Sequence, residues 1–134
     1  MKNSEKGQAL VITLILVAFG TLVITPFLGN AGSNMIGSRA YGKAITEQYS
    51  SDAGVEHAIW DLAYDDLADQ LESPGDNVSY SLGEAINGVV PDITVVKTDN
   101  TTYEITSVAN DETIMAVVEI SGENVTVNQW QINP

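Results

Sequence analysis

The 134-residue sequence contains no cysteine, one histidine and five basic residues against eighteen acidic ones. Without cysteine there is no disulfide framework, no thiolate metal site and no thiol nucleophile. Nucleic acid is disfavoured as a partner, because binding it requires clustered lysine and arginine to displace phosphate counterions. The length fits one domain of ordinary size.

The few basic residues are concentrated at the start of the chain. Residues 1–43 carry a net charge of +3 and residues 44–134 a net charge of -16. Between Lys6 and Arg39 lie 32 residues without a formal charge, and Ala9–Leu28 is the apolar part of this run. About 20 such residues in a helix cross a hydrocarbon core of about 30 Å. The threonines in this stretch can return their hydroxyls to backbone carbonyls of the preceding turn, so the sequence predicts a membrane-spanning helix.

Lys2 and Lys6 predict a cytoplasmic N-terminus by the positive-inside tendency, which places the acidic remainder outside. Three interpretations fit this segment. The first is a cleaved secretory signal, cut near Gly29-Asn30-Ala31, although the apolar run is longer than the usual 7 to 15 residues of such signals. The second interpretation is an ordinary single-span anchor, and the third depends on the residues that precede the run.

Two motifs resemble those of type IV pilins and their relatives. The first, Lys6-Gly7-Gln8-Ala9-Leu10-Val11, is similar to the class III leader that prepilin peptidase cuts after glycine on the cytoplasmic side. The second, within Tyr49–Ala58, resembles the stretch that follows the membrane helix in PilX-type minor pilins and pseudopilins. Its central residues are Asp52, Ala53, Gly54, Val55 and Glu56.

The resemblance implies a function and a set of partners. The peptidase would cut between Gly7 and Gln8, with N-methylation of the new terminus, and the helix would then leave the membrane to join a filament. The partners implied are other pilin-like subunits, the peptidase, an inner-membrane assembly platform and membrane lipid. The implied location is the cytoplasmic membrane, crossed once with the N-terminus inside, and then a cell-surface filament of a pilus or secretion system. The assembly-helix residues would be Ala9, Leu10, Val11, Ile12, Leu14, Ile15, Leu16, Gly20 and Pro26.

One position departs from the pilin pattern. Major pilins carry glutamate at the fifth residue after the cut, where this chain has Ile12. In the family that glutamate neutralises a neighbouring subunit's terminal amine inside the membrane, where an unpaired charge is costly. Ile12 therefore favours a minor subunit. Gly20 and Pro26 are expected to be soft points in the helix, although membrane helices also tolerate both residues.

The remainder of the sequence predicts an α+β fold of pilin-like architecture, in which the long N-terminal helix continues into an amphipathic helix packed on an antiparallel sheet. The helical period returns at Ala44 and is expected to stop at Ser73–Asn77. Its apolar stripe comprises Ile45, Tyr49, Ala53, Trp60, Ala63, Leu67 and Leu71, interrupted by Glu56, with Val55, Ile59 and Leu62 beside it. Short links predict a meander of strands over 78–82, 92–98, 102–109, 113–121 and 125–132. The predicted segments are a leader over 1–7, an apolar helix and exit over 8–43, and an acidic helix-plus-sheet domain over 44–134.

Large aromatic side chains are expected to anchor the core of this acidic domain, because aromatic residues are mostly buried. The residues expected in this role are Trp60, Tyr64, Tyr103 and Trp130.

The sequence favours a non-enzymatic role. His57 and the adjacent Glu56 point about 100° apart on a helix, which is poor geometry for a proton relay. No spacing singles out a carboxylate pair for acid–base work. No cofactor is expected.

Polar patterns in the acidic half suggest two weaker possibilities. Asp61, Asp65 and Asp69 would stack at i, i+4 and i+8 on a helix, where a solvated acidic face is favoured over a calcium site because there is no ligand loop. No metal is therefore expected, with these three as the weak candidates. Sequons at Asn77, Asn100 and Asn124 permit glycosylation.

Overall fold

A computed structural model describes residues 4–122 and 124–134, with side chains from residue 10 onward. The chain forms two units, Met1–Tyr41 and Gly42–Pro134. Helix α1 (Ser4–Tyr64) makes up the described part of the first unit and continues into the second. The second unit also contains a short 3₁₀ helix and five strands: η1 (Ala68–Gln70), β1 (Asn77–Ser81), β2 (Asp92–Lys97), β3 (Thr102–Ala109), β4 (Glu112–Ser121) and β5 (Asn124–Ile132).

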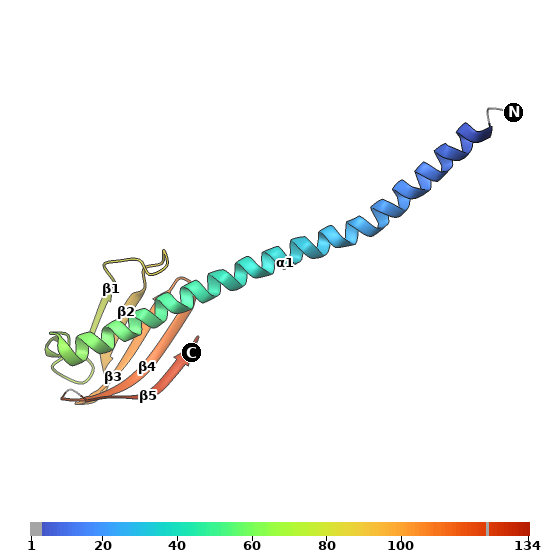
Figure 1. Ribbon diagram of the computed structural model, residues 1–134. Coiled ribbons are helices and arrows are strands. Elements are labelled where there is room, and N and C mark those ends of the chain that lie inside the picture. Colours follow the sequence, from blue (N-terminus) through green and yellow to red (C-terminus); the bar gives the residue numbers. More distant parts are fainter. Residues whose placement is uncertain (1–3, 123) are drawn as a thin grey trace. The chain divides into compact units, whose positions relative to one another are not determined.

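The five strands form one antiparallel sheet in the order β1-β2-β3-β4-β5, so each strand pairs with its neighbours in sequence (Figure 1). The predicted meander is confirmed, and every predicted strand bound lies within one residue of the observed one. The pairing of β4 with β5 is shifted between Val117 and Val118, which marks a bulge in this ladder.

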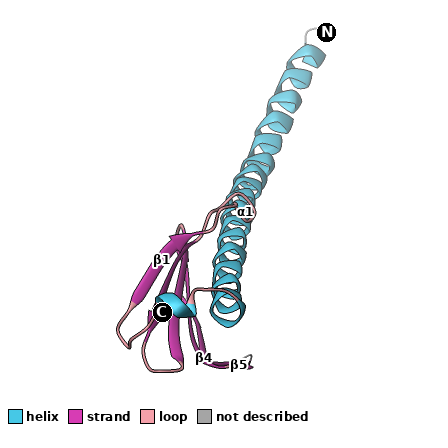
Figure 2. Ribbon diagram, turned by 90° about the vertical axis from the view of Figure 1, so that its left-hand side faces the viewer, coloured by secondary structure: helices cyan, strands magenta, loops and turns pink. Residues whose placement is uncertain are grey.

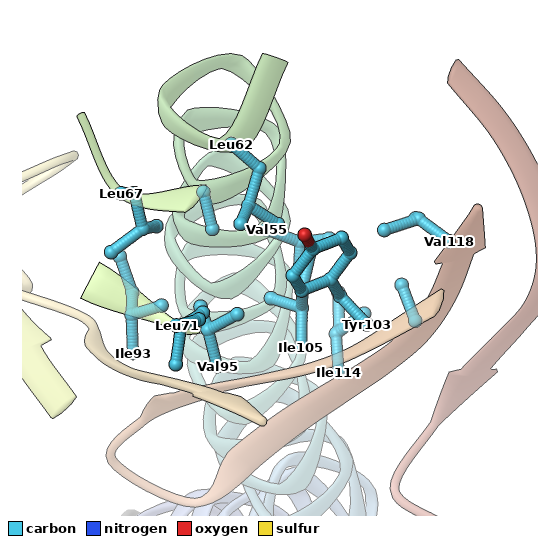
Figure 3. Packing of buried hydrophobic residues seen from close by; sticks show 12 residues of the cluster. Val55, Leu62, Leu67, Leu71, Ile93, Val95, Tyr103, Ile105, Ile114 and Val118 are labelled. Carbon is cyan, nitrogen blue, oxygen red and sulfur yellow. The ribbon is translucent and has the colours of Figure 1, made fainter. Parts of the chain in front are cut away.

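The core lies between the sheet and the last turns of α1, which pack against one face of the sheet (Figure 2). On β4, Ile114, Ala116 and Val118 are buried and alternate with less buried residues, so one face of the strand meets the core. Figure 3 shows how the side chains of helix and strands meet. The fully or nearly buried members are Val55, Ala58, Leu62, Leu67, Leu71, Ile93, Val95, Tyr103, Ile105, Ile114, Ala116 and Val118.

The face of α1 that meets the sheet differs from the predicted stripe. Tyr49 and Trp60 are 62% and 55% exposed, whereas Val55, Ala58 and Leu62 are buried. Small residues decide this orientation, since a tyrosine or tryptophan would hold the helix away from the sheet, while serine, glycine and alanine let it approach. The predicted stripe therefore had the right period, but its main row lay to one side of the true contact.

The prediction that the helix continues to Ser73 is wrong. Helix α1 ends at Tyr64, and the chain turns through η1 before β1. This turn brings Leu67 and Leu71 back into the core. A straight continuation of the helix would have carried both residues past the sheet. Lys97 Nζ donates to the Leu71 carbonyl oxygen at 2.7 Å and thereby satisfies a backbone acceptor in the turn.

Three of the four predicted aromatic anchors are not buried. Tyr103 lies in the core, but Trp60, Tyr64 and Trp130 are exposed. Trp60 and Tyr64 contact each other on the outer side of α1, with ring centroids 6.1 Å apart. Trp130 belongs to β5, an edge strand of the sheet, where fewer neighbours are available to cover it. Aliphatic side chains fill most of the core instead.

Candidate functional site

The apolar segment of α1, residues 10–28, exposes a long run of large hydrophobic side chains. Leu10, Leu16, Phe19 and Leu28 are each exposed by about two thirds, and none of the most apolar window of this helix is buried. Within the described part of the chain, α1 is the helix long and apolar enough to cross a membrane. An apolar surface of this size on a solvated helix is unfavourable, so it requires lipid or protein around it.

The polar groups within this segment are satisfied by the helix itself. Thr21 Oγ1 donates to the Ala18 carbonyl oxygen at 2.9 Å, and Thr25 Oγ1 donates to the Thr21 carbonyl oxygen at 2.6 Å. This confirms the predicted return of threonine hydroxyls to the backbone for these two residues. A membrane-spanning helix needs such internal satisfaction, because the hydrocarbon core offers no water.

The helix is continuous through Gly20 and Pro26. A Cβ atom added at Gly20, Gly29 or Gly37 would meet nothing within 4 Å, so the fold of this chain does not itself require glycine there. The exit from the apolar segment is helical as well, since α1 extends without a break to Tyr64.

The processing prediction falls on the first turns of α1. The backbone at Gly7 and Gln8 is helical, whereas the side chains before Leu10 lie outside those that the structure describes. Cleavage between these two residues stays a prediction.

The motif from Asp52 to Glu56 lies where α1 crosses the sheet. Val55 is buried in the core, and Glu56 faces solvent. At Gly54 the helix lies very close to Ser107 and Pro91. A Cβ atom added there would overlap Ser107 Oγ and lie 3.2 Å from Pro91 Cβ. Glycine at this position therefore has a packing role, which lets the helix approach β3 closely.

A hollow of about 380 Å³ lies beside the end of α1. Asp61 Oδ2 accepts a hydrogen bond from the Tyr80 hydroxyl at 3.1 Å and lies 2.9 Å from His57 Nδ1. Burial, together with the charge and hydrogen bond of Asp61, raises the pKa of Tyr80 above its ordinary value. The other lining residues are Asp65, Asp66, Leu67, Gln70 and Val78.

This hollow does not contain the predicted row of three carboxylates. Because α1 ends at Tyr64, Asp65 falls in the turn and Asp69 in η1, so the expected i, i+4, i+8 stack on one helix is wrong. Among the described residues, no group of three or more His, Cys, Asp or Glu side chains is arranged to hold a metal ion.

The three sequon asparagines are all accessible. Asn77 begins β1, Asn100 lies in the turn between β2 and β3, and Asn124 begins β5. Their exposure is compatible with modification, which stays a prediction.

Sequence reasoning missed a set of polar contacts between α1 and the sheet, which we call the polar seam. On the helix it comprises Lys43, Glu47, Ser50 and Ser51, of which the last three are buried. Three hydrogen bonds tie these buried residues to the sheet unit: Asn110 Nδ2 donates to Glu47 Oε1 at 2.8 Å, Ser50 Oγ to the Val89 carbonyl oxygen at 3.0 Å, and Ser51 Oγ to the Ser107 carbonyl oxygen at 2.6 Å.

An exposed ion pair between Lys43 and Asp111 lies at one end of the polar seam. Lys43 Nζ lies 2.8 Å from Asp111 Oδ2 and 3.4 Å from Glu47 Oε1. Hydrogen bonds to Asp111 and then to Glu47 raise the pKa of Lys43, and the bond from Lys43 lowers the pKa of Asp111. The Lys43–Glu47 spacing of four residues was the available sequence signal, but no pattern indicated which sheet residues would meet it.

No known protein family, curated protein or solved structure matches the chain. The exposed apolar helix and the helix-on-sheet unit are therefore the observations on which a function can be argued.

Proposed function

We propose that this chain is a structural subunit, of the minor type, of a type IV pilus or related secretion filament. In this proposal the chain sits in the cytoplasmic membrane with its N-terminus inside, is cut by prepilin peptidase after Gly7, and assembles through its apolar helix. The observation that carries the proposal is the exposed apolar segment of α1, continuous with a helix packed on an antiparallel sheet. The leader-like residues before it and the Asp52–Glu56 motif support the same assignment.

The physics of the apolar segment constrains how assembly proceeds. Fully burying one large aliphatic side chain is worth about 1.5–3 kcal/mol relative to water, and this segment exposes many of them. The helix must therefore pass directly from lipid into a bundle of partner helices, without an intermediate in water. Lipid and protein are similarly apolar, so packing between helices decides the outcome.

The acidic sheet unit would then be displayed at the surface of the filament. Residues 44–134 carry a net charge of -16, which keeps this unit soluble outside the membrane. Neither part of the proposal requires catalysis or a cofactor.

A charged substitution within the apolar segment tests assembly. Leu16 is exposed in the middle of the segment, so Leu16→Asp leaves the sheet unit intact. Aspartate at the centre of a membrane helix costs about 2.5–3.5 kcal/mol on insertion scales, which the rest of the run tolerates. In a packed bundle the unpaired charge has no partner, so we expect the variant in membranes but absent from filaments. Leu16→Ile is the matched control and should assemble normally.

A second candidate function is an anchored or exported acidic surface domain that binds a ligand or cation and never polymerises. The hollow beside Asp61 and Tyr80 is the observation that favours it. This alternative predicts that the unmodified chain is absent from the filament fraction and that Leu16→Asp affects only membrane retention. Recovery of the unmodified chain in the filament fraction supports the filament subunit, and its absence from that fraction supports the anchored or exported domain.

A further inference from the structure

The contact between α1 and the sheet changes in character along the helix. From Lys43 to Ser51 the contact is the polar seam, made of hydrogen bonds and one ion-pair cluster. From Val55 to Leu62 the contact is apolar and belongs to the central core. Gly54 lies between the two parts, where the helix is closest to Ser107 and Pro91.

The two parts differ in what they lose when the helix separates from the sheet. Opening the apolar part exposes Val55, Ala58 and Leu62 to water, which removes hydrophobic stabilisation in proportion to the area exposed. Opening the polar seam releases carboxylate, amide, hydroxyl and ammonium groups that form new hydrogen bonds with water. Because the net contribution of such exchanged hydrogen bonds is small, the seam is the weaker contact.

We propose that residues 42–51 of α1 open from the sheet as a separate unit while Val55, Ala58 and Leu62 remain packed. The proposal concerns the folded chain alone and does not depend on filament assembly. Opening exposes the buried faces of Glu47, Ser50 and Ser51 over nearly three helical turns.

The absence of cysteine from the whole sequence makes thiol labelling a direct test. Ser51 and Ala58 are both small and fully buried on the same face of α1, one in the polar seam and one in the core. The full-length variants Ser51→Cys and Ala58→Cys, in detergent micelles, are exposed to a thiol reagent under native conditions and at low guanidinium concentrations. We expect Ser51→Cys to react at least about tenfold faster, with little dependence on denaturant, as local opening requires. Ala58→Cys should react only by global unfolding, with a strong dependence on denaturant.

Equal labelling rates with equal denaturant dependence would overturn the proposal, because the helix would then separate from the sheet as one cooperative unit. Faster labelling at Ala58→Cys would overturn it as well.

A variant on the sheet side supplies a further test. Asn110 has a positive φ of 56° and donates to Glu47, so Asn110→Gly keeps the backbone conformation while removing the hydrogen bond. We expect this substitution to accelerate labelling at Ser51→Cys, because this hydrogen bond is broken when residues 42–51 open. An unchanged labelling rate at Ser51→Cys would show that the reaction does not proceed through opening of the polar seam, and would overturn the proposal.

Discussion

Gly54 gives the sharpest test of how α1 packs on the sheet. In the interior of a solvent-exposed helix, glycine to alanine stabilises by about 0.5–1 kcal/mol. At Gly54, however, the added Cβ atom would overlap Ser107 Oγ and lie 3.2 Å from both Pro91 Cβ and Ser107 Cβ. Overpacking of this kind costs about 1–3 kcal/mol, so Gly54→Ala should lower the free energy of unfolding by up to about 2.5 kcal/mol after the helical gain is subtracted.

Ser107 provides the partner for a double-mutant cycle. Its Oγ is buried and has no hydrogen-bond partner among the described residues. Removing an unpaired buried hydroxyl is near neutral or stabilising, so Ser107→Ala alone should change stability by no more than about 0.5 kcal/mol in the unfavourable direction. In the double variant the hydroxyl no longer blocks the new methyl group, and at least about 1 kcal/mol should be recovered as coupling.

The assay is guanidinium unfolding of the full-length chain in micelles, followed by tryptophan fluorescence and near-ultraviolet circular dichroism. Gly42→Ala is the matched control on the same helix, because a Cβ atom there would meet nothing within 4 Å. It should stabilise by the ordinary helical amount. A stabilising Gly54→Ala, or additive effects of Gly54→Ala and Ser107→Ala, would refute the close approach of α1 to β3.

Three further predictions concern the sheet unit. Lys97→Met should lower the free energy of unfolding by about 1–3 kcal/mol, because it leaves the Leu71 carbonyl oxygen without the Lys97 ammonium donor, and an unchanged denaturation midpoint would contradict this. Tyr103→Ala should cost about 3–5 kcal/mol, whereas Trp60→Ala should cost less than about 1 kcal/mol, and the reverse order in chemical denaturation would restore Trp60 as a core anchor. The pKa of Tyr80 is raised in the folded state, so the unfolded tyrosine loses its proton first as the pH rises. The free energy that Tyr80 contributes to folding is therefore fully present below about pH 10 and declines at higher pH. Tyr80→Phe should remove this part of the alkaline decline in stability between pH 9 and 11 while Tyr64→Phe should not, and identical pH profiles would count against the Tyr80–Asp61 contact.

The sequence predicted the strands well because each is short, alternates in polarity and is bounded by turn residues such as Asn110-Asp111. It predicted the apolar helix because charge is absent over a long run. The helix face was harder, since the apolar pattern around Tyr49 and Trp60 competes with the small residues Ser51, Gly54 and Ala58, and only the opposing surface of β3 decides between them. The true end of α1 depends on Leu67 and Leu71 folding back into the core, which is a tertiary effect that overrides helical periodicity.

The polar seam could not be derived from the sequence for a similar reason. Lys43, Glu47 and Ser51 fall on one helix face, but their partners lie at positions set by the register of β3 with β4 and by the loop before β2. The serine pair within the apolar stripe, together with the Lys43–Glu47 spacing of four residues, is a local sign that the contact becomes polar at that point.

The most direct test of the proposed function is the N-terminus of the mature protein, measured by intact mass and peptide sequencing from native membranes. The proposal predicts a chain that begins at Gln8, with the terminal amine methylated, present in both membrane and filament fractions. A chain that begins at Gly32 would indicate a cleaved secretory signal and a freely exported domain. A chain that still begins at Met1 or Lys2 would indicate a conventional anchor, and either of these results would contradict the filament mechanism.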